Sequence, residues 1–234
     1  KLLEYNGIAV KNQFIGNGSD EIIDLLYRAF CNPGQDKVLT FTPTFGMYQV
    51  AADINAIELI KRPLNKEFQI NRNDLKPHFN DENLKLIFIC SPNNPTGNCF
   101  NKSDIEFILN NFNGIVIIDE AYIDFSNKTS WEKSFQDYPN LIVTQTFSKA
   151  WGLAAARIGI AYASDDIITL LNTIKMPYNV SELNEKAAIN ALENQTTFEA
   201  NKQIILEEKT KLIQQLQALD LIKKIYPSDA NFLL

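Results

Sequence analysis

Short apolar runs rich in β-branched residues alternate with helical patterns along the chain up to Ala163. The apolar runs predict buried strands, and they lie at Lys37–Phe41, Ala56–Ile60, Leu84–Cys90, Gly114–Ile118, Leu141–Thr146 and Ile158–Ala163. Apolar residues spaced three or four apart predict helices between several of these runs, at Asp20–Phe30, Lys102–Leu109 and Asp166–Leu171. Strands that alternate with helices indicate an α/β fold whose mostly parallel sheet carries helices on both faces.

The pattern changes after Ala163. Ser181–Leu192 and Thr197–Leu219 both show helical spacing with interspersed Glu and Lys, and the second predicts a long amphipathic helix. A short segment, Leu221–Tyr226, follows it, and we expect this segment to begin a smaller α+β unit.

These patterns predict a large domain over residues 1–194 and an incomplete second unit over residues 195–234. The chain begins at Lys1 without a Met and ends on the apolar run Asn231–Leu234. We therefore expect it to be part of a longer protein.

Composition and charge argue against several classes of protein. The 234 residues are 45% hydrophobic, and 22 Lys and Arg face 28 Asp and Glu, so the formal net charge is -6. No apolar run approaches the length of a membrane span, and no broad basic field exists to attract nucleic acid. We expect neither a membrane nor a nucleic acid as a partner.

The cysteines and the single histidine limit the chemistry further. Cys31, Cys90 and Cys99 form no CxxC pair, which argues against a disulfide framework and a thiolate metal site and favours the cytoplasm. His78 stands between Pro77 and Phe79, and we expect a solvated loop residue there. Serine or cysteine nucleophiles activated by histidine, and metal sites, therefore have no good candidate.

A glycine-rich turn, Gly16–Glu21, leads into the first predicted helix. Unpaired backbone N–H groups at such a helix start can cradle a phosphate. Alternatively, Ser19 or Asp20 caps the helix and no ligand is involved. Glu21 stands where a dinucleotide fingerprint needs its third small residue, and no GxxxxGK occurs, so a nicotinamide enzyme and a P-loop protein lose their main support.

Polar residues also follow the strands that end at Cys90 and Ile118. In Ser91–Gly97 two prolines bracket two asparagines, which is consistent with a simple turn or with an amide held rigidly at the carboxyl edge of the sheet. Asp119 ends a wholly apolar strand. A buried carboxylate there requires a positive partner, unless it is an exposed acid or a helix cap.

Lys149 follows the strand that ends at Thr146, and Arg157 comes eight residues later. Together they could pair an amine nucleophile with a phosphate clamp. Alternatively, Lys149 is an ordinary surface lysine.

Taken in order, these motifs resemble the large domain of fold-type I aminotransferases that depend on pyridoxal 5'-phosphate, most closely the histidinol-phosphate aminotransferase family. The resemblance covers essentially the whole chain and rests on GNGSDE (16–21), PTFGMY (43–48), SPNNPTG (91–97), DEAY (119–122), SKAWGL (148–153), RIG (157–159) and PYN (177–179).

The resemblance implies three catalytic residues. Lys149 would bind the cofactor covalently and move the proton between the Cα of the substrate and C4′ of the cofactor. Asp119 would pair with the pyridine nitrogen and keep the ring protonated. Tyr122, with Asn94, would hydrogen-bond the phenolic oxygen of the cofactor.

The resemblance also implies the remaining cofactor contacts. The phosphate would be bound by the amides of Gly18, Ser19 and Asp20, together with Thr146, Ser148 and Arg157. Phe45 would stack on the pyridine ring where family members commonly carry tyrosine, so stacking is kept but a hydroxyl is lost.

The implied activity is amino transfer between L-histidinol phosphate and 2-oxoglutarate in histidine biosynthesis, by a homodimer. An aromatic amino-acid aminotransferase, a threonine-phosphate decarboxylase and a cofactor-binding fragment without turnover remain alternatives.

Overall fold

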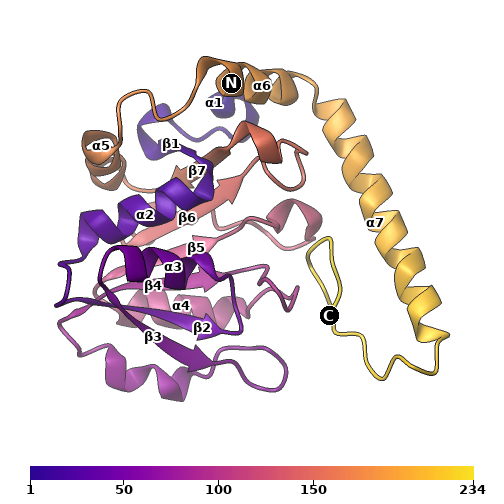
Figure 1. Cartoon of the computed structure of the whole chain (residues 1–234), viewed down its shortest axis with the longest axis horizontal. Helices are drawn as coiled ribbons and strands as arrows, with labels where there is room; N and C mark the ends of the chain where they lie inside the picture. Colours follow the sequence, from indigo (N-terminus) through magenta and orange to yellow (C-terminus); the bar gives the residue numbers. More distant parts are fainter.

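The computed structural model describes residues 1–234 and contains one seven-stranded sheet with strand order β1-β7-β6-β5-β4-β2-β3 (Figure 1). The strands are β1 (Gln13–Asn17), β2 (Lys37–Thr42), β3 (Glu58–Pro63), β4 (Leu84–Cys90), β5 (Ile115–Asp119), β6 (Leu141–Thr146) and β7 (Ile158–Tyr162). The strands from β3 across to β6 pair in parallel, whereas β7 is antiparallel to both β6 and β1. The predicted mostly parallel sheet is confirmed.

The helices are α1 (Leu2–Asn6), α2 (Gly18–Phe30), α3 (Met47–Ile54), α4 (Lys102–Asn111), α5 (Asp165–Ile174), α6 (Glu182–Glu193) and α7 (Gln195–Gln217). Sequence patterns did not predict α1, α3 or β1, because each is short and β1 ends in polar residues. They also started β3 too early. Ala56 has a φ of 53°, a left-handed conformation that ends the α3 segment and cannot continue into a strand.

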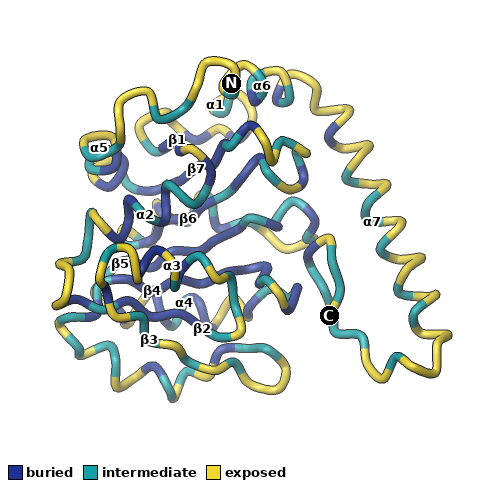
Figure 2. Tube along the Cα trace, in the orientation of Figure 1, coloured by how far each residue is buried: buried dark blue, intermediate teal, exposed yellow.

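Helices cover both faces of the sheet, as predicted. One core joins α2, α3 and α5 to side chains such as Phe88 and Ile117, and the other joins α4 and α6 to side chains such as Ile87 and Val116. Adjacent strand residues divide between the two cores because successive side chains point to opposite faces. Both cores are buried, which explains why the central strands are apolar along their whole length (Figure 2).

The C-terminal part of the chain leaves the large body along α7 and then returns to its loops (Figure 1). Helix α7 buries only Phe198, whose ring stacks on Trp151 with a centroid distance of 3.9 Å. Residues 218–234 contain no helix or strand, so the expected small α+β unit has no regular element over Leu221–Tyr226. This segment contacts the large body through Asp229, whose N–H donates to the Gly97 carbonyl at 2.7 Å.

The structure also bears on two expectations from the sequence, the absence of a membrane span and a solvated His78. None of the helices combines the length and apolar character that crossing a bilayer requires.

His78 is not the fully solvated residue that its neighbours suggested, because it lies half-buried in a 3-10 turn and its Nε2 accepts a hydrogen bond from Arg62 Nε at 2.8 Å. Burial, followed by the nearby Arg62 charge, lowers the pKa of His78.

Candidate active site

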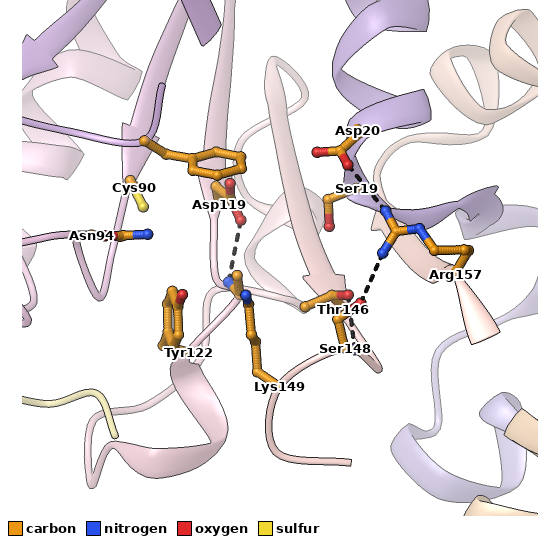
Figure 3. A pocket seen from close by; sticks show the side chains of 12 residues that line it. Ser19, Asp20, Cys90, Asn94, Asp119, Tyr122, Thr146, Ser148, Lys149 and Arg157 are labelled. Atoms are coloured by element: carbon orange, nitrogen blue, oxygen red, sulfur yellow. Dashed lines mark hydrogen bonds and ion pairs between the residues drawn. The ribbon is translucent and has the colours of Figure 1, made fainter. Parts of the chain in front are cut away.

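One cavity lies at the carboxyl edge of the sheet, between the ends of β4, β5 and β6 and the start of α2 (Figure 3). It encloses about 530 Å³ of empty space, counted with its open mouth. The residues that line it are Ser19, Asp20, Phe45, Cys90, Asn94, Asp119, Ala121, Tyr122, Thr146, Ser148, Lys149 and Arg157. All the candidate residues from the sequence except Gly18 are in this set. The four segments meet because the carboxyl ends of neighbouring parallel strands share one edge, where α/β proteins bind ligands.

Asp119 is the last residue of β5, and its side chain is buried without a cationic partner. Only 2% of the residue is exposed. Its Oδ2 accepts a hydrogen bond from the Tyr48 hydroxyl at 2.9 Å, and its Oδ1 accepts one from the Ala121 N–H at 3.2 Å. Burial raises the pKa of Asp119, and hydrogen bonds, that from Tyr48 first, act in the opposite direction. No side-chain cation is among the groups that shift this pKa, so the chain itself does not supply the positive partner that the sequence predicted for Asp119.

Lys149 lies in the turn that follows β6, on a different element from Asp119. Its Nζ lies 5.3 Å from the centre of the Tyr122 ring, a distance at which an ammonium group and an aromatic face attract each other. Figure 3 shows Lys149, Tyr122 and Asp119 around the same space. An amine and a buried carboxylate therefore border one cavity from two sides.

The two asparagines of the turn after β4 have different environments. Asn93 is completely buried, and its amide group donates to the Pro43 carbonyl at 2.9 Å and to the Thr96 hydroxyl at 2.8 Å. Its Oδ1 also accepts from the Thr44 hydroxyl at 2.8 Å. Asn94 lines the cavity instead. Asn93 therefore holds the turn together, and Asn94 is the residue available to a ligand.

Arg157 and the start of α2 form the opposite end of the cavity. The Nη2 of Arg157 donates to Asp20 Oδ2 at 3.0 Å, and its Nη1 lies 3.5 Å from Ser148 Oγ. The Thr146 hydroxyl accepts a hydrogen bond from the Ser148 N–H at 3.1 Å. Arg157 itself has a φ of 50°, and residues held in this strained region cluster at ligand sites.

Ser19 and Asp20, the two cap candidates from the sequence, do not cap α2, which argues against a purely structural role for these two side chains. Ser19 Oγ is buried and has no hydrogen-bond partner, and Asp20 pairs with Arg157. The backbone N–H of Asn17 instead donates to Glu21 Oε2 at 2.5 Å. An orphaned hydroxyl, a guanidinium group and the N–H groups of a helix start together suit an anion.

Two residues, one beside the cavity and one lining it, were absent from the site candidates drawn from sequence. Tyr48 is fully buried and reaches Asp119 across 71 residues of chain; its place at the end of PTFGMY (43–48) was its only signal in the sequence. Cys90 lines the cavity, and burial raises its pKa to about 12, so the thiol stays neutral. No group of three or more His, Cys, Asp or Glu side chains is placed to hold a metal ion.

Comparison with known proteins places the whole chain in one family. The sequence profile of the family described as Aminotransferase class I and II matches residues 2–234. A histidinol-phosphate aminotransferase from Flavobacterium psychrophilum is 51% identical over 233 residues, which cover 100% of this chain and 67% of that protein.

Solved structures give the same fold. The histidinol-phosphate aminotransferase of Clostridium acetobutylicum superposes with a TM-score of 0.89 at 25% identity, over 99% of this chain and 69% of that one. The enzyme from Sinorhizobium meliloti, solved in complex with pyridoxal-5'-phosphate, also gives a TM-score of 0.89, at 24% identity over 99% of this chain and 63% of that one. The chain belongs to the class I and II aminotransferase family.

Proposed function

We propose that the chain is a pyridoxal-phosphate-dependent aminotransferase that exchanges an amino group between L-histidinol phosphate and 2-oxoglutarate. The products are imidazole acetol phosphate and L-glutamate. The observation that carries the proposal is one cavity that presents Lys149 and the buried Asp119 to the same space. Arg157 and the start of α2 form the other end of this cavity, called here the anion end. The name of the F. psychrophilum relative supports this substrate.

The anion end suits the phosphate group of the cofactor. Ser19 Oγ has no partner within the protein, and a phosphate oxygen would supply one. Arg157 would provide the charge and Ser148 and Thr146 further polar contacts, while the amides of Gly18, Ser19 and Asp20 would point at the phosphate. Asp20 already accepts from Arg157 Nη2, so this carboxylate would orient the guanidinium and leave its other face to the ligand.

The middle of the cavity suits a heteroaromatic ring. Asp119 would face the ring nitrogen, and a proton on that nitrogen would supply the cation that no side chain provides. Phe45 would pack on the ring, and Asn94 and Tyr122 would hydrogen-bond its phenolic oxygen. When bound, the cofactor supplies an electron sink for the electron pair of the substrate Cα.

Lys149 would act as the proton carrier. Its Nζ would remove the proton from the substrate Cα and return it on the cofactor side. The Tyr122 ring, 5.3 Å from Nζ, would hold the protonated amine within the cavity between these two events. Lys149, Asp119 and Tyr122 are thus the proposed catalytic residues.

Covalent labelling tests the assignment of Lys149. The protein incubated with pyridoxal phosphate should develop visible absorption, and borohydride should attach a pyridoxyl group to Lys149, located by peptide mass spectrometry. Lys149→Ala should abolish the adduct, whereas Lys186→Ala, at an exposed site on α6, should leave it intact. An adduct on another lysine, or none on the folded protein, would refute the proposal.

Half-reactions test the substrate. Histidinol phosphate should convert the bound cofactor to its amino form faster than phenylalanine does, and phosphothreonine should release no carbon dioxide. Faster reaction with phenylalanine would identify an aromatic aminotransferase. Cofactor binding without any half-reaction would identify a binding module without turnover.

We further propose that the chain works as a cytoplasmic homodimer and that residues 195–234 belong to a second structural unit. The three unpaired cysteines are consistent with a reducing compartment. Exposed apolar side chains border a groove beside the N-terminal residues, among them Leu3 at 47% and Tyr178 at 96% exposure, as expected of a surface that another subunit covers. Analytical ultracentrifugation of the cofactor-loaded protein should give twice the chain mass.

A further inference from the structure

Tyr48 contacts Asp119 and is shielded completely from solvent. It occupies the first turn of α3 and is completely buried. Its hydroxyl donates to Asp119 Oδ2 at 2.9 Å. The ring is held on two sides, by Phe88, on which it stacks with centroids 4.8 Å apart, and by Phe45, which meets it edge-on at 5.7 Å. The position of the hydroxyl is therefore fixed by packing.

This contact favours the charged form of Asp119. Burial favours the neutral carboxyl group, and the hydrogen bond from Tyr48 is the foremost interaction that favours the ionised form. Burial and the neighbouring carboxylate raise the pKa of Tyr48 itself well above its usual value, so the hydroxyl remains a donor throughout the range in which enzymes work.

The other side chains that face Asp119 favour its ionised form less than Tyr48 does, or oppose it. Cys90, opposite Asp119 on β4, is a neutral thiol whose Sγ donates to the Pro92 carbonyl at 3.5 Å. Thr144, opposite Asp119 on β6, has a buried hydroxyl that forms no well-aligned hydrogen bond, and it lowers the pKa of Asp119 less than Tyr48 does. Asp20, on α2, repels a negative charge on Asp119.

We propose that Tyr48 is a positioning residue whose hydroxyl keeps the Asp119 carboxylate ionised and fixed in direction toward the ring nitrogen of the bound cofactor. This inference rests on the proposed function. The first turn of α3 also contacts both residues that are proposed to hold the cofactor ring. Tyr48 touches Asp119, which would face the ring nitrogen, and Phe45, which would pack on the ring face. Helix α3 would thereby set the carboxylate at the ring edge and the aromatic side chain on the ring face together.

The direct test follows the titration of Asp119 in the cofactor-free protein by carbon-13 NMR of labelled carboxyl groups, with Asp119→Asn to assign the signal. In Tyr48→Phe the acid dissociation constant of Asp119 should fall about tenfold, because a buried carboxylate loses a donor. Tyr162→Phe is the matched control. It removes a hydroxyl that is also buried but accepts from Asn6 Nδ2, on the other face of the sheet, and it should leave the titration unchanged.

A second measurement uses the cofactor-loaded protein. Tyr48→Phe should weaken the binding of pyridoxal phosphate about tenfold but leave the binding of its analogue without the ring nitrogen unchanged. An equal loss for both ligands, or a titration of Asp119 that Tyr48→Phe does not shift, would overturn the inference.

A second variant and a readout that needs no cofactor ensure that the experiment can contradict the inference. If Tyr48→Phe does not fold, replacement of Tyr48 by 3-fluorotyrosine strengthens the donor and should raise the acid dissociation constant of Asp119; no change, or a fall, would overturn the inference. The titration needs no cofactor, so failure of this inference is distinct from failure of the proposed function, which would appear as missing borohydride labelling at Lys149 in the unmodified protein.

Discussion

The Arg157 guanidinium lies so close to the backbone of Gly18 that a Cβ at position 18 would stand 2.3 Å from its Nη2. Gly18 also has a φ of 75°, which other residues rarely adopt. The start of α2 and the guanidinium can therefore share the anion end of the cavity only because residue 18 has no side chain.

Gly18→Ala should displace Arg157 and weaken pyridoxal phosphate binding at least tenfold, as measured by fluorescence titration. Gly7→Ala is the matched control, because Gly7 has a φ of 73° and nothing within 4 Å of an added Cβ. Both variants should lose about 1 kcal/mol of stability from backbone strain, but only Gly18→Ala should lose cofactor affinity. Equal affinities for the two variants would contradict the proposed phosphate site.

Ser19→Ala should weaken the binding of pyridoxal phosphate without destabilising the cofactor-free protein. The Ser19 hydroxyl is buried without a partner, so its removal should leave the cofactor-free protein as stable as before, or more stable by roughly 1 kcal/mol. Because the same hydroxyl is proposed to bind phosphate, the affinity for pyridoxal phosphate should fall by about tenfold. Urea unfolding with and without the cofactor checks both effects, and a destabilised cofactor-free variant would show that Ser19 has a structural partner instead.

Stability of the cofactor-free protein should fall as the pH rises from about 5 to 8. Burial raises the pKa of Glu120 from 4.5 to about 7 and that of Asp124 from 3.8 to about 6. In this range the folded state holds protons that the unfolded state has released, so a rise in pH favours unfolding.

Glu120→Gln should reduce this dependence by roughly 1 to 3 kcal/mol over the range. Most contacts of the side chain can persist, since Gln145 and Ser130 can each rotate to pair with an amide. Chemical denaturation at a series of pH values is the measurement. A variant whose stability depends on pH as steeply as that of the unmodified protein would show that Glu120 is ionised in the folded state.

Asp229→Ala should release the C-terminal segment from the large body. Asp229 Oδ2 accepts from the Cys99 N–H at 2.9 Å, and Oδ1 lies 3.3 Å from the Ser126 hydroxyl. Loss of these bonds should cost about 1 to 2 kcal/mol locally and speed hydrogen exchange at the Cys99 amide. The exposed Asp220 provides the control, Asp220→Ala, which should exchange like the unmodified protein; unchanged exchange in Asp229→Ala would show that other contacts hold the segment.

The long buried strands and the amphipathic helices were predictable because their hydrophobic periodicity is local. The β4 and β6 bounds agree with the sequence patterns, and helix α2 begins only two residues before its predicted start. Strand β1 and helix α3 were missed because they are short, and they become regular only through pairing with β7 and packing against α2.

Sequence by itself determined which chemistry is available: a lysine, an aspartate and an arginine that follow apolar strands, and a glycine turn that precedes a helix. Only the tertiary structure decided which groups cooperate. It placed Tyr48 against Asp119, assigned Asn93 to the turn and Asn94 to the cavity, and paired Asp20 with Arg157. The physical reason is that periodicity and turn chemistry act between near neighbours, whereas hydrogen bonds across the sheet depend on how separate elements pack.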